Sequence, residues 1–458
     1  MKHLLLIFSA IILFQPLRAQ DKDSLMSTQL FGEALNSNVA YQQLFQLCSI
    51  APGRLAGTPE SAIAIDFMFN LMKSMPFDTV YKQPCMVRKW IRGNEEEAWF
   101  TTDGDNKTNI NIDVLGGSVP TPEKGILAPV IVFSSIEEMQ KANPATIKGK
   151  IVYFNRPMNQ NYYITFRAYG ENASMRVYGA DEASKFGAIA VVVRSLNTAT
   201  DTFPHTGIMR YKTSDVRIPG FAVSTADADV LDKAIAENPG LKIYLKCSCI
   251  EYAQVQSYNV IGEIKGSVFP ARYISVGGHL DSWFNSSGAH DDGGGCIQSL
   301  EVARLFFVLG YKPQNTIRVV MFIDEEMEQR GGRAYANNAI ANGEKHVFAL
   351  ESDRGVTTPT GFSIDASESV LQKMELWKKY FEAYGIRVFE KGGSGVDVGF
   401  LKQAGVPLAG LVTESQRYFE FHHSANDTWQ NVNRREMQLG SAAMALLIYL
   451  VDQHGLDK

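Results

Sequence analysis

Cysteine is scarce in this chain, and its distribution excludes one class of protein. The five cysteines among 458 residues are Cys48, Cys85, Cys247, Cys249 and Cys296. Such a low density is not the disulfide framework of a small secreted domain, and an odd number cannot all pair within one chain. Cys247 and Cys249 have no second pair of Cys or His nearby, so we expect them to be small apolar residues on one face of a strand.

Basic runs and low-complexity segments are also missing. The chain has 44 Lys and Arg against 49 Asp and Glu, and its 45% hydrophobic and 20% charged content is typical of a folded globular protein. Because no basic patch is present, we expect no nucleic-acid partner. The length predicts two or three domains, since 458 residues exceed one ordinary domain.

The apolar run at the N-terminus is too short to span a bilayer, which needs about 20 residues. Lys2 precedes the run, residues 4–14 carry no charge, and Ala19 offers a small residue for cleavage before Gln20. This pattern predicts that residues 1–19 are a signal peptide and that the mature chain is exported, to the periplasm or outside the cell, with no membrane span left. Loss of Lys2 and Arg18, without any acid, would change the net charge from −5 to −7.

The middle of the chain differs from its flanks in the secondary structure that it predicts. Residues 30–75 show the three- and four-residue apolar spacing of helices, broken by Pro and Gly. Short strands separated by turns follow, at 149–154, 187–193 and 218–223. We therefore predict that residues 118–250 form a separate, small β-rich domain.

The last part of the chain alternates strands with helices. The predicted strands, rich in β-branched and apolar residues, are 273–276, 316–323, 347–350 and 408–412. Continuous apolar strands alternating with helices predict an α/β fold, with a mostly parallel, mixed sheet covered by helices on both faces. Residues 20–117 and 251–458 would together form this domain.

Acidic and histidine side chains follow the ends of the predicted strands. They are His279, Asp281, Asp291, Asp292, Glu325, Glu326, Asp353, His422 and His423. Because the carboxyl ends of strands line the binding crevice of an open α/β sheet, we expect these residues to converge there.

Each of these motifs alone is weak evidence, but their combination indicates a metal site. Carboxylates and imidazoles held close together are costly unless a cation neutralises them. Three Asp or Glu and two His suit zinc, which binds such ligands at about 2.0–2.2 Å. One bridging carboxylate with two further ligands per ion predicts two zinc ions, about 3.5–4 Å apart.

Several motifs resemble those of the zinc aminopeptidase and carboxypeptidase family, whose members share a co-catalytic two-zinc centre. They are Trp90-Ile91-Arg92-Gly93, Pro204-His205-Thr206-Gly207-Ile208, Gly278-His279-Leu280-Asp281-Ser282-Trp283 and Phe421-His422-His423-Ser424. The resemblance covers almost all of the mature chain. It implies a zinc-exopeptidase fold, with residues 118–250 as an inserted protease-associated domain, and it suggests a homodimer.

The same resemblance assigns the metal ligands. It implies that His279 and Asp353 hold one zinc, and that Glu326 and His423 hold the other, with Asp291 as the bridge. On the residues alone, the neighbouring His422 and Asp292 stay nearly equal alternatives for His423 and Asp291.

Two further residues receive catalytic roles from the resemblance. Glu325 would be the general base, which takes a proton from the metal-bound water and passes it to the leaving amine. Asp281 would orient His279, as metal-bound imidazoles usually require. Glu328 departs from the pattern of the family, because many relatives have Gly at that position. A charge so close to the site could change which substrate terminus is accepted.

The function expected from this resemblance is that of an exported di-zinc exopeptidase acting on dipeptides or short peptides with free termini. The alternatives are an aminopeptidase on longer peptides, a single-zinc cyclase of N-terminal glutamine, and a binding protein that has lost its metals. We expect His205 to be structural. Asp397 could contact substrate or equally cap the helix that follows.

Overall fold

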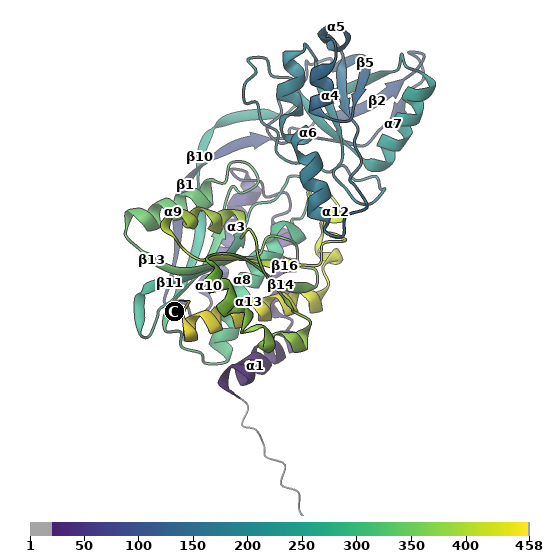
Figure 1. Cartoon of the computed structure of the whole chain (residues 1–458). Coiled ribbons are helices and arrows are strands. Elements are labelled where there is room, and N and C mark those ends of the chain that lie inside the picture. The colour runs from purple at the N-terminus through teal and green to yellow at the C-terminus, as the bar shows by residue number, and fades with distance from the viewer. Residues whose placement is uncertain (1–20, 457–458) are drawn as a thin grey trace, which may run out of the picture.

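The structure is a computed structural model, which describes residues 21–456. The predicted signal peptide lies outside the described residues. Figure 1 shows two bodies, a larger one that carries the N-terminal helix and most helices, and a smaller one above it. Of the helices in the described part, none is long and apolar enough to cross a membrane.

The larger domain is built on an eight-stranded mixed sheet. Its order is β1 (Thr79–Ile91), β10 (Ile250–Ile264), β12 (Asn315–Phe322), β11 (Phe269–His279), β13 (Lys345–Glu351), β16 (Leu408–Thr413), β14 (Pro359–Asp365) and β15 (Val388–Lys391). The neighbours β12–β11, β11–β13, β13–β16 and β14–β15 are parallel, and the other pairs are antiparallel. The α/β class and the parallel centre of the sheet are confirmed.

Helices cover both faces of this sheet. On one face lie α1 (Lys22–Asn36), α2 (Val39–Ile50), α3 (Pro59–Lys73), α8 (Gly294–Val308), α10 (Glu368–Glu375) and α13 (Arg434–His454), and on the other lie α9 (Arg330–Ala341) and α11 (Val396–Gly399). Side chains alternate along each strand, so Val319 and Met321 pack against the first set, while Val320 and Phe322 pack against the second. Because both faces are buried, β12 is buried along its whole length, and its second half, residues 319–322, is entirely apolar.

A second sheet of eight strands forms the smaller domain. Its order is β3 (Thr108–Asn109), β2 (Glu96–Thr101), β9 (Lys242–Cys247), β5 (Ile126–Phe133), β6 (Ile151–Phe154), β7 (Ala190–Arg194), β8 (Gly220–Val223) and β4 (Ile112–Val114). The helices α4 (Ile136–Lys141), α5 (Pro144–Ile147), α6 (Thr165–Lys185) and α7 (Thr225–Glu237) accompany it. The segment expected from the sequence, 118–250, lacks β2–β4, because β2 precedes it and pairs with β9 across the whole insertion.

The two domains are joined through the long antiparallel pair β1–β10. Their register runs from Thr79 opposite Glu263 to Ile91 opposite Ile250. The chain enters the smaller domain after β1 and returns along β10, so both crossings lie side by side (Figure 1).

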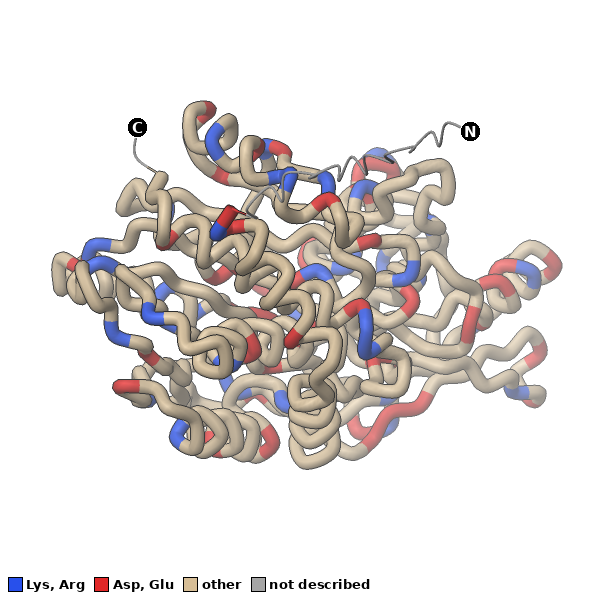
Figure 2. The backbone as a smooth tube through the Cα atoms, turned by 90° about the horizontal axis from the view of Figure 1, so that it is seen from below, with Lys and Arg blue, Asp and Glu red and all other residues tan. Residues whose placement is uncertain are grey.

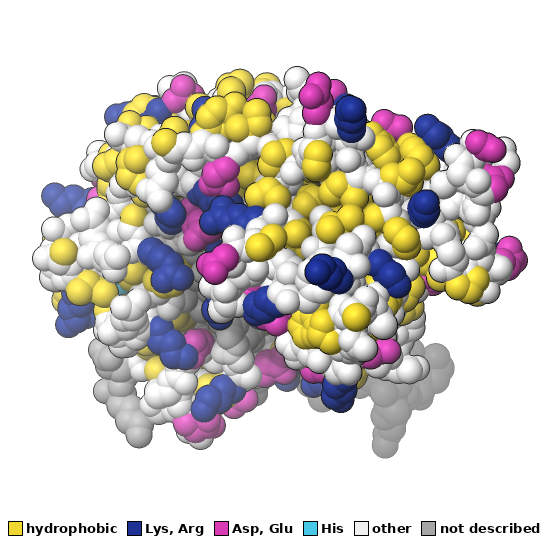
Figure 3. Space-filling view, turned by 90° about the horizontal axis from the view of Figure 1, so that it is seen from above, with side chains coloured by type: hydrophobic (Ala, Val, Ile, Leu, Met, Phe, Trp, Pro, Cys, Tyr) yellow, Lys and Arg dark blue, Asp and Glu magenta, His cyan; other side chains and the backbone are white. Residues whose placement is uncertain are grey.

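Charged residues of both signs are spread over the described chain, and the cysteines lie inside it. Basic and acidic residues are interspersed along the chain (Figure 2), and the face seen in Figure 3 mixes charged with apolar side chains. All five cysteines are buried and free.

The buried Asn259 of β10 connects the sheet to the loop that follows β12. Its amide donates to Gln83 Oε1 and to the Gly331 carbonyl, both at 2.9 Å, and its oxygen accepts from the Ile323 N–H at 3.0 Å. Asn259 thereby fixes both ends of the segment 323–331, which carries Glu325 and Glu326.

We expect Asn259→Ala to lower the free energy of unfolding by about 2–4 kcal/mol, because it leaves buried polar groups without partners. Urea denaturation would measure this. Asn36→Ala, which removes one exposed hydrogen bond at the end of α1, should change the free energy by less than about 0.5 kcal/mol. Equal losses in the two variants would contradict the role of Asn259.

Candidate metal centre

Three neighbouring strands of the larger sheet end at the same edge. β11 ends at His279, which pairs with Phe322 at the end of β12, and Glu351 at the end of β13 pairs with Gly277. The residues that directly follow these strands therefore meet. The loop after α12 (Tyr418–Phe421) brings His422 and His423 to the same place.

His279 is the first of two buried imidazoles at this edge. Its Nε2 lies 3.2 Å from Asp291 Oδ1 and 3.2 Å from Asp353 Oδ1. Its Nδ1 faces the main-chain carbonyl of Asp281 at 3.1 Å. A carbonyl can only accept, so Nδ1 carries the proton and the Nε2 lone pair faces the two carboxylates.

His423 repeats this arrangement on the other side of Asp291. Its Nε2 lies 3.3 Å from Asp291 Oδ2 and 3.2 Å from Glu326 Oε2. Its Nδ1 faces the Thr206 carbonyl at 3.2 Å. Asp291 thus lies between the two imidazoles and turns one carboxylate oxygen towards each.

The donor spacing fits zinc. Two ligands held tetrahedrally at about 2.0–2.2 Å from one ion lie roughly 3.3–3.6 Å from each other, close to the distances seen here. Asp291 Oδ2 and Glu326 Oε1 are buried and have no hydrogen-bond partner among the described residues. The groups of donors close enough to share an ion are His279–Asp291–Glu326, His279–Asp292–Asp353 and Asp291–His422–His423. Together they include all five ligands expected from the sequence.

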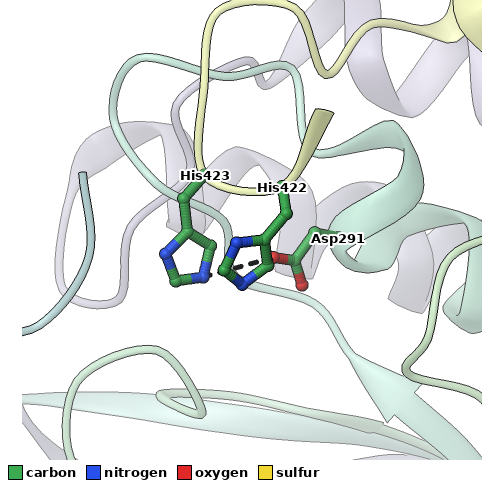
Figure 4. Close-up of side chains that lie close together, drawn as sticks. All are labelled: Asp291, His422 and His423. Atoms are coloured by element: carbon green, nitrogen blue, oxygen red, sulfur yellow. Dashed lines mark ion pairs between the residues drawn. The ribbon is translucent and has the colours of Figure 1, made fainter. Parts of the chain in front are cut away.

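The geometry separates the candidates that the residues alone left open. Asp292 is engaged, since it accepts from the His279 N–H at 3.0 Å and from the Gly295 N–H at 3.1 Å. His422 stacks on His423, with ring centroids 3.5 Å apart, and its Nε2 is 3.8 Å from Asp291 (Figure 4). The shorter distances favour His423 and Asp291 as ligands.

Glu325 lies beside these donors but belongs to none of the three groups. It is half-buried and lines the cavity above the site. Burial raises the pKa of Glu325 well above its ordinary value, and the neighbouring Asp353 and Glu326 add to the shift. Its surroundings thus favour a carboxylate that can take up a proton.

Asp281 holds the glutamate pair through the main chain. Its carboxylate accepts from the Glu325 N–H at 3.2 Å and from the Glu326 N–H at 3.3 Å, and Oδ1 is 3.8 Å from His279 Nδ1. Asp427, four residues after His423, accepts from the N–H groups of His290 at 2.7 Å and Asp291 at 3.1 Å.

The smaller domain forms the roof of a cavity of about 250 Å³ over the site. From the roof come Phe166, Tyr169, Arg176, Ile208 and Arg210, and from below come Asp291, Glu325, Glu326, Asp353 and His423. The candidate donors therefore line a small cavity that both domains form and that is partly open to solvent.

Arg176, in α6, was not singled out from the sequence. The side chain is buried, and among the described residues no carboxylate lies within 4.0 Å of its nitrogens. Nη2 donates to the Tyr169 hydroxyl at 2.7 Å, and Nη1 donates to the Thr206 carbonyl at 3.4 Å and lies 3.5 Å from His423 Nδ1. Nε has no partner in the described part of the chain. A buried guanidinium without a counter-ion favours an anionic ligand in the cavity.

Three other residues discussed from the sequence have clear places. His205 is buried and donates from Nδ1 to the His422 carbonyl at 2.6 Å, and burial lowers its pKa to about 3. Asp397 is buried, caps no helix because the N-cap of α11 is Gly395, and is absent from the cavity lining. Glu328 pairs with Arg210 at 3.1 Å and Arg88 at 3.6 Å, so its charge is compensated.

Backbone strain is concentrated at the site. Asp324, Gln329 and His423 are the non-glycine residues with positive φ in the described chain, at 69°, 59° and 63°. Such conformations cost about 1–3 kcal/mol each and persist only where the surroundings impose them. All three flank or belong to the segments that carry the site.

Several known proteins resemble this chain in sequence and in architecture. The model of peptidase family M28 matches residues 259–448. Carboxypeptidase Q from Bos taurus is 32% identical over 93% of this chain and 88% of its own length, and that from Homo sapiens is 33% identical over the same shares. A crystal structure of a peptidase M28 precursor from Shewanella amazonensis SB2B has a TM-score of 0.90 at 31% identity, covering 95% of this chain and 97% of that one. The zinc aminopeptidase BSAP from Bacillus subtilis shares the fold, with a TM-score of 0.65 at 20% identity. The match covers 92% of this chain and 96% of BSAP.

We expect zinc to raise the melting temperature of the metal-free chain by several degrees. A ligand bound only by the folded state stabilises it by about 4 kcal/mol at a thousand times its Kd. Asp291→Ala removes the carboxylate between the two imidazoles and should cut the rise in melting temperature that zinc causes to less than half. Asp66→Ala changes an exposed carboxylate on α3 and should leave the gain intact. Thermal denaturation with zinc and with a chelator would decide, and equal gains in all three proteins would contradict the assignment.

Proposed function

Because this chain belongs to peptidase family M28, we propose that it is an exported two-zinc exopeptidase that hydrolyses dipeptides or short peptides with free termini. The observation that carries the proposal is the placement of Asp291 between His279 and His423, at the floor of a small cavity that the smaller domain covers. In this proposal the smaller domain, about residues 95–249, is the inserted protease-associated domain. Export stays a prediction from the N-terminal pattern, and a homodimer stays a prediction from the family resemblance.

The donors would hold two ions. His279 and Asp353 would hold one zinc, Glu326 and His423 the other, and Asp291 would contribute one oxygen to each. When bound, zinc lowers the pKa of water and polarises a carbonyl group as a Lewis acid.

Glu325 is the group of this chain that moves the proton. Its carboxylate would accept a proton from the attacking water and deliver it to the nitrogen of the leaving amine. Its raised pKa helps it to hold the proton between these two steps. Asp281 keeps the glutamate main chain in place through its two hydrogen bonds.

The preference for short substrates follows from the cavity. A space of about 250 Å³ suits a dipeptide better than a long chain, which would need an open cleft. Arg176 supports recognition of a free carboxylate, because a substrate carboxylate would supply the counter-ion that this buried guanidinium lacks.

Glu325→Gln should lower kcat for free dipeptides by about 10²–10⁴-fold, the range for loss of a general base, while zinc content stays at two per chain. The assay would compare free dipeptides, their N-acetylated and C-amidated forms, and aminoacyl anilides. Fast cleavage of anilides would move the function to an aminopeptidase on longer peptides. No hydrolysis at all, with two zinc ions bound, would refute the peptidase proposal and favour a cyclase or a binding protein.

Arg176→Met should raise KM for free dipeptides by about 10–100-fold, because a hydrogen bond to a charged group contributes about 1.5–3 kcal/mol. For C-amidated dipeptides, which have no free carboxylate, KM should rise much less. Arg167→Met, on an exposed part of the same helix, is the matched control. It should leave KM unchanged for both free and C-amidated dipeptides. If Arg176→Met reduced cleavage of free and amidated dipeptides equally, Arg176 would not recognise the carboxylate.

A further inference from the structure

The segment Pro204–Ile208 of the smaller domain reaches the loop that carries His422 and His423. The Thr206 N–H donates to the His423 carbonyl at 3.0 Å, and His205 Nδ1 donates to the His422 carbonyl at 2.6 Å. In the opposite direction, His423 Nδ1 donates to the Thr206 carbonyl at 3.2 Å. Three hydrogen bonds thus join the segment to the main chain and side chain of the loop.

The third of these hydrogen bonds sets the protonation of the His423 ring. The Thr206 carbonyl accepts only and lies closer to Nδ1 than the Arg176 Nη1 donor does, at 3.2 Å against 3.5 Å, so Nδ1 keeps its proton. In the neutral ring, Nε2 then presents its lone pair to Asp291 and Glu326. Partners of this kind orient a metal-binding imidazole and make it a better ligand.

The other contacts hold the main chain of His423 in a conformation that it would not keep alone. Its φ is 63°, in the left-handed region. The His423 carbonyl accepts from the Thr206 N–H and, at 3.1 Å, from Asn285 Nδ2. These external donors can balance the strain of about 1–3 kcal/mol that such a residue carries.

The segment itself is firmly anchored in the smaller domain. The His205 N–H donates to Ser195 Oγ at 2.8 Å, and Ser195 Oγ donates to the Val223 carbonyl at 2.7 Å. Thr206 Oγ1 donates to the Val114 carbonyl, also at 2.7 Å. A displacement of the smaller domain would therefore carry the Thr206 carbonyl away from His423.

The imidazole of His279 does not depend on the smaller domain. His279 finds its Nδ1 partner in the Asp281 carbonyl, two residues further along its own strand end. Its other neighbours, Asp291 and Asp353, also belong to the larger domain. The two halves of the metal centre thus differ in their support.

We propose that His205 and Thr206 are positioning residues for the zinc held by His423 and Glu326, so that this ion depends on the docked smaller domain while the ion at His279 and Asp353 does not. The inference rests on the two-zinc centre of the proposed function. It gives the Pro204–Ile208 motif a task, and it makes the inserted domain a structural part of one metal site as well as the roof of the cavity.

Zinc affinity tests the proposal directly. Competition with a chromophoric chelator would resolve the two zinc dissociation constants of the whole chain. His205→Phe, which removes the donor to the His422 carbonyl, should weaken one zinc by about 10–100-fold, the usual effect of losing a residue that supports a metal ligand, and leave the other within about twofold. Equal weakening of both ions, or no weakening, would overturn the proposal.

Two matched variants separate positioning from general damage. His205→Asn places an amide donor near the position of Nδ1 and should restore most of the lost affinity. Tyr211→Phe removes a partly buried hydroxyl of the smaller domain that donates to the Ile218 carbonyl at 2.6 Å and accepts from the Val119 N–H at 3.3 Å, with no hydrogen bond to the loop of His422 and His423, and should change neither zinc affinity. Loss of the same zinc in Tyr211→Phe, or no rescue by His205→Asn, would contradict the specific role of His205.

A further variant keeps the test decisive if His205→Phe does not fold. Ser195→Ala removes only the hydroxyl that holds the His205 N–H, and should weaken the same ion by a few-fold, whereas an unchanged affinity would overturn the proposal. Failure of the proposed function is seen separately: a wild-type chain that binds two zinc ions but cleaves no peptide would refute the peptidase and leave the positioning result standing.

Discussion

Mutual repulsion among buried carboxylates is the constraint on which this structure depends. Asp291, Glu326 and Asp353 meet at the ends of adjacent strands, where two imidazoles lie within 3.2–3.3 Å of them. Water is largely excluded there, so the negative charges must be balanced from within or by bound cations. The hydrogen bonds around the site, including those of Asp281 and Asp427, keep the donors in place and leave the oxygens between the imidazoles free.

The two domains divide the work of the site. The larger domain supplies all five proposed donors and Glu325, the proposed proton acceptor. The smaller domain covers the donors, limits the cavity to a small volume and brings Arg176 into it as a buried cation without a counter-ion. It also supports one imidazole through a main-chain carbonyl. In the proposed function, metal binding, substrate size and substrate charge would therefore be linked through one docking arrangement, which the paired strands β1 and β10 connect to the main sheet.

The sequence predicted the strand ends well because apolar strands followed directly by acids and histidines leave a local pattern, as at His279. It did not predict the start of the smaller domain, because β2 pairs with β9, about 150 residues later, and such a pairing leaves no local pattern. Arg176 was missed because a sequence does not show which cations lack a partner. The Thr206 carbonyl was equally hidden, since every residue has one and only the fold brings this one to His423.

The central claim is that Asp291 joins two zinc sites, and anomalous X-ray diffraction from zinc-loaded crystals at the zinc absorption edge tests it most directly. The account predicts two anomalous peaks about 3.5–4 Å apart, the usual separation in two-metal sites. One peak would lie beside His279 and Asp353, the other beside Glu326 and His423, with an Asp291 oxygen next to each. A single peak, or a second peak away from Asp291, would contradict the account.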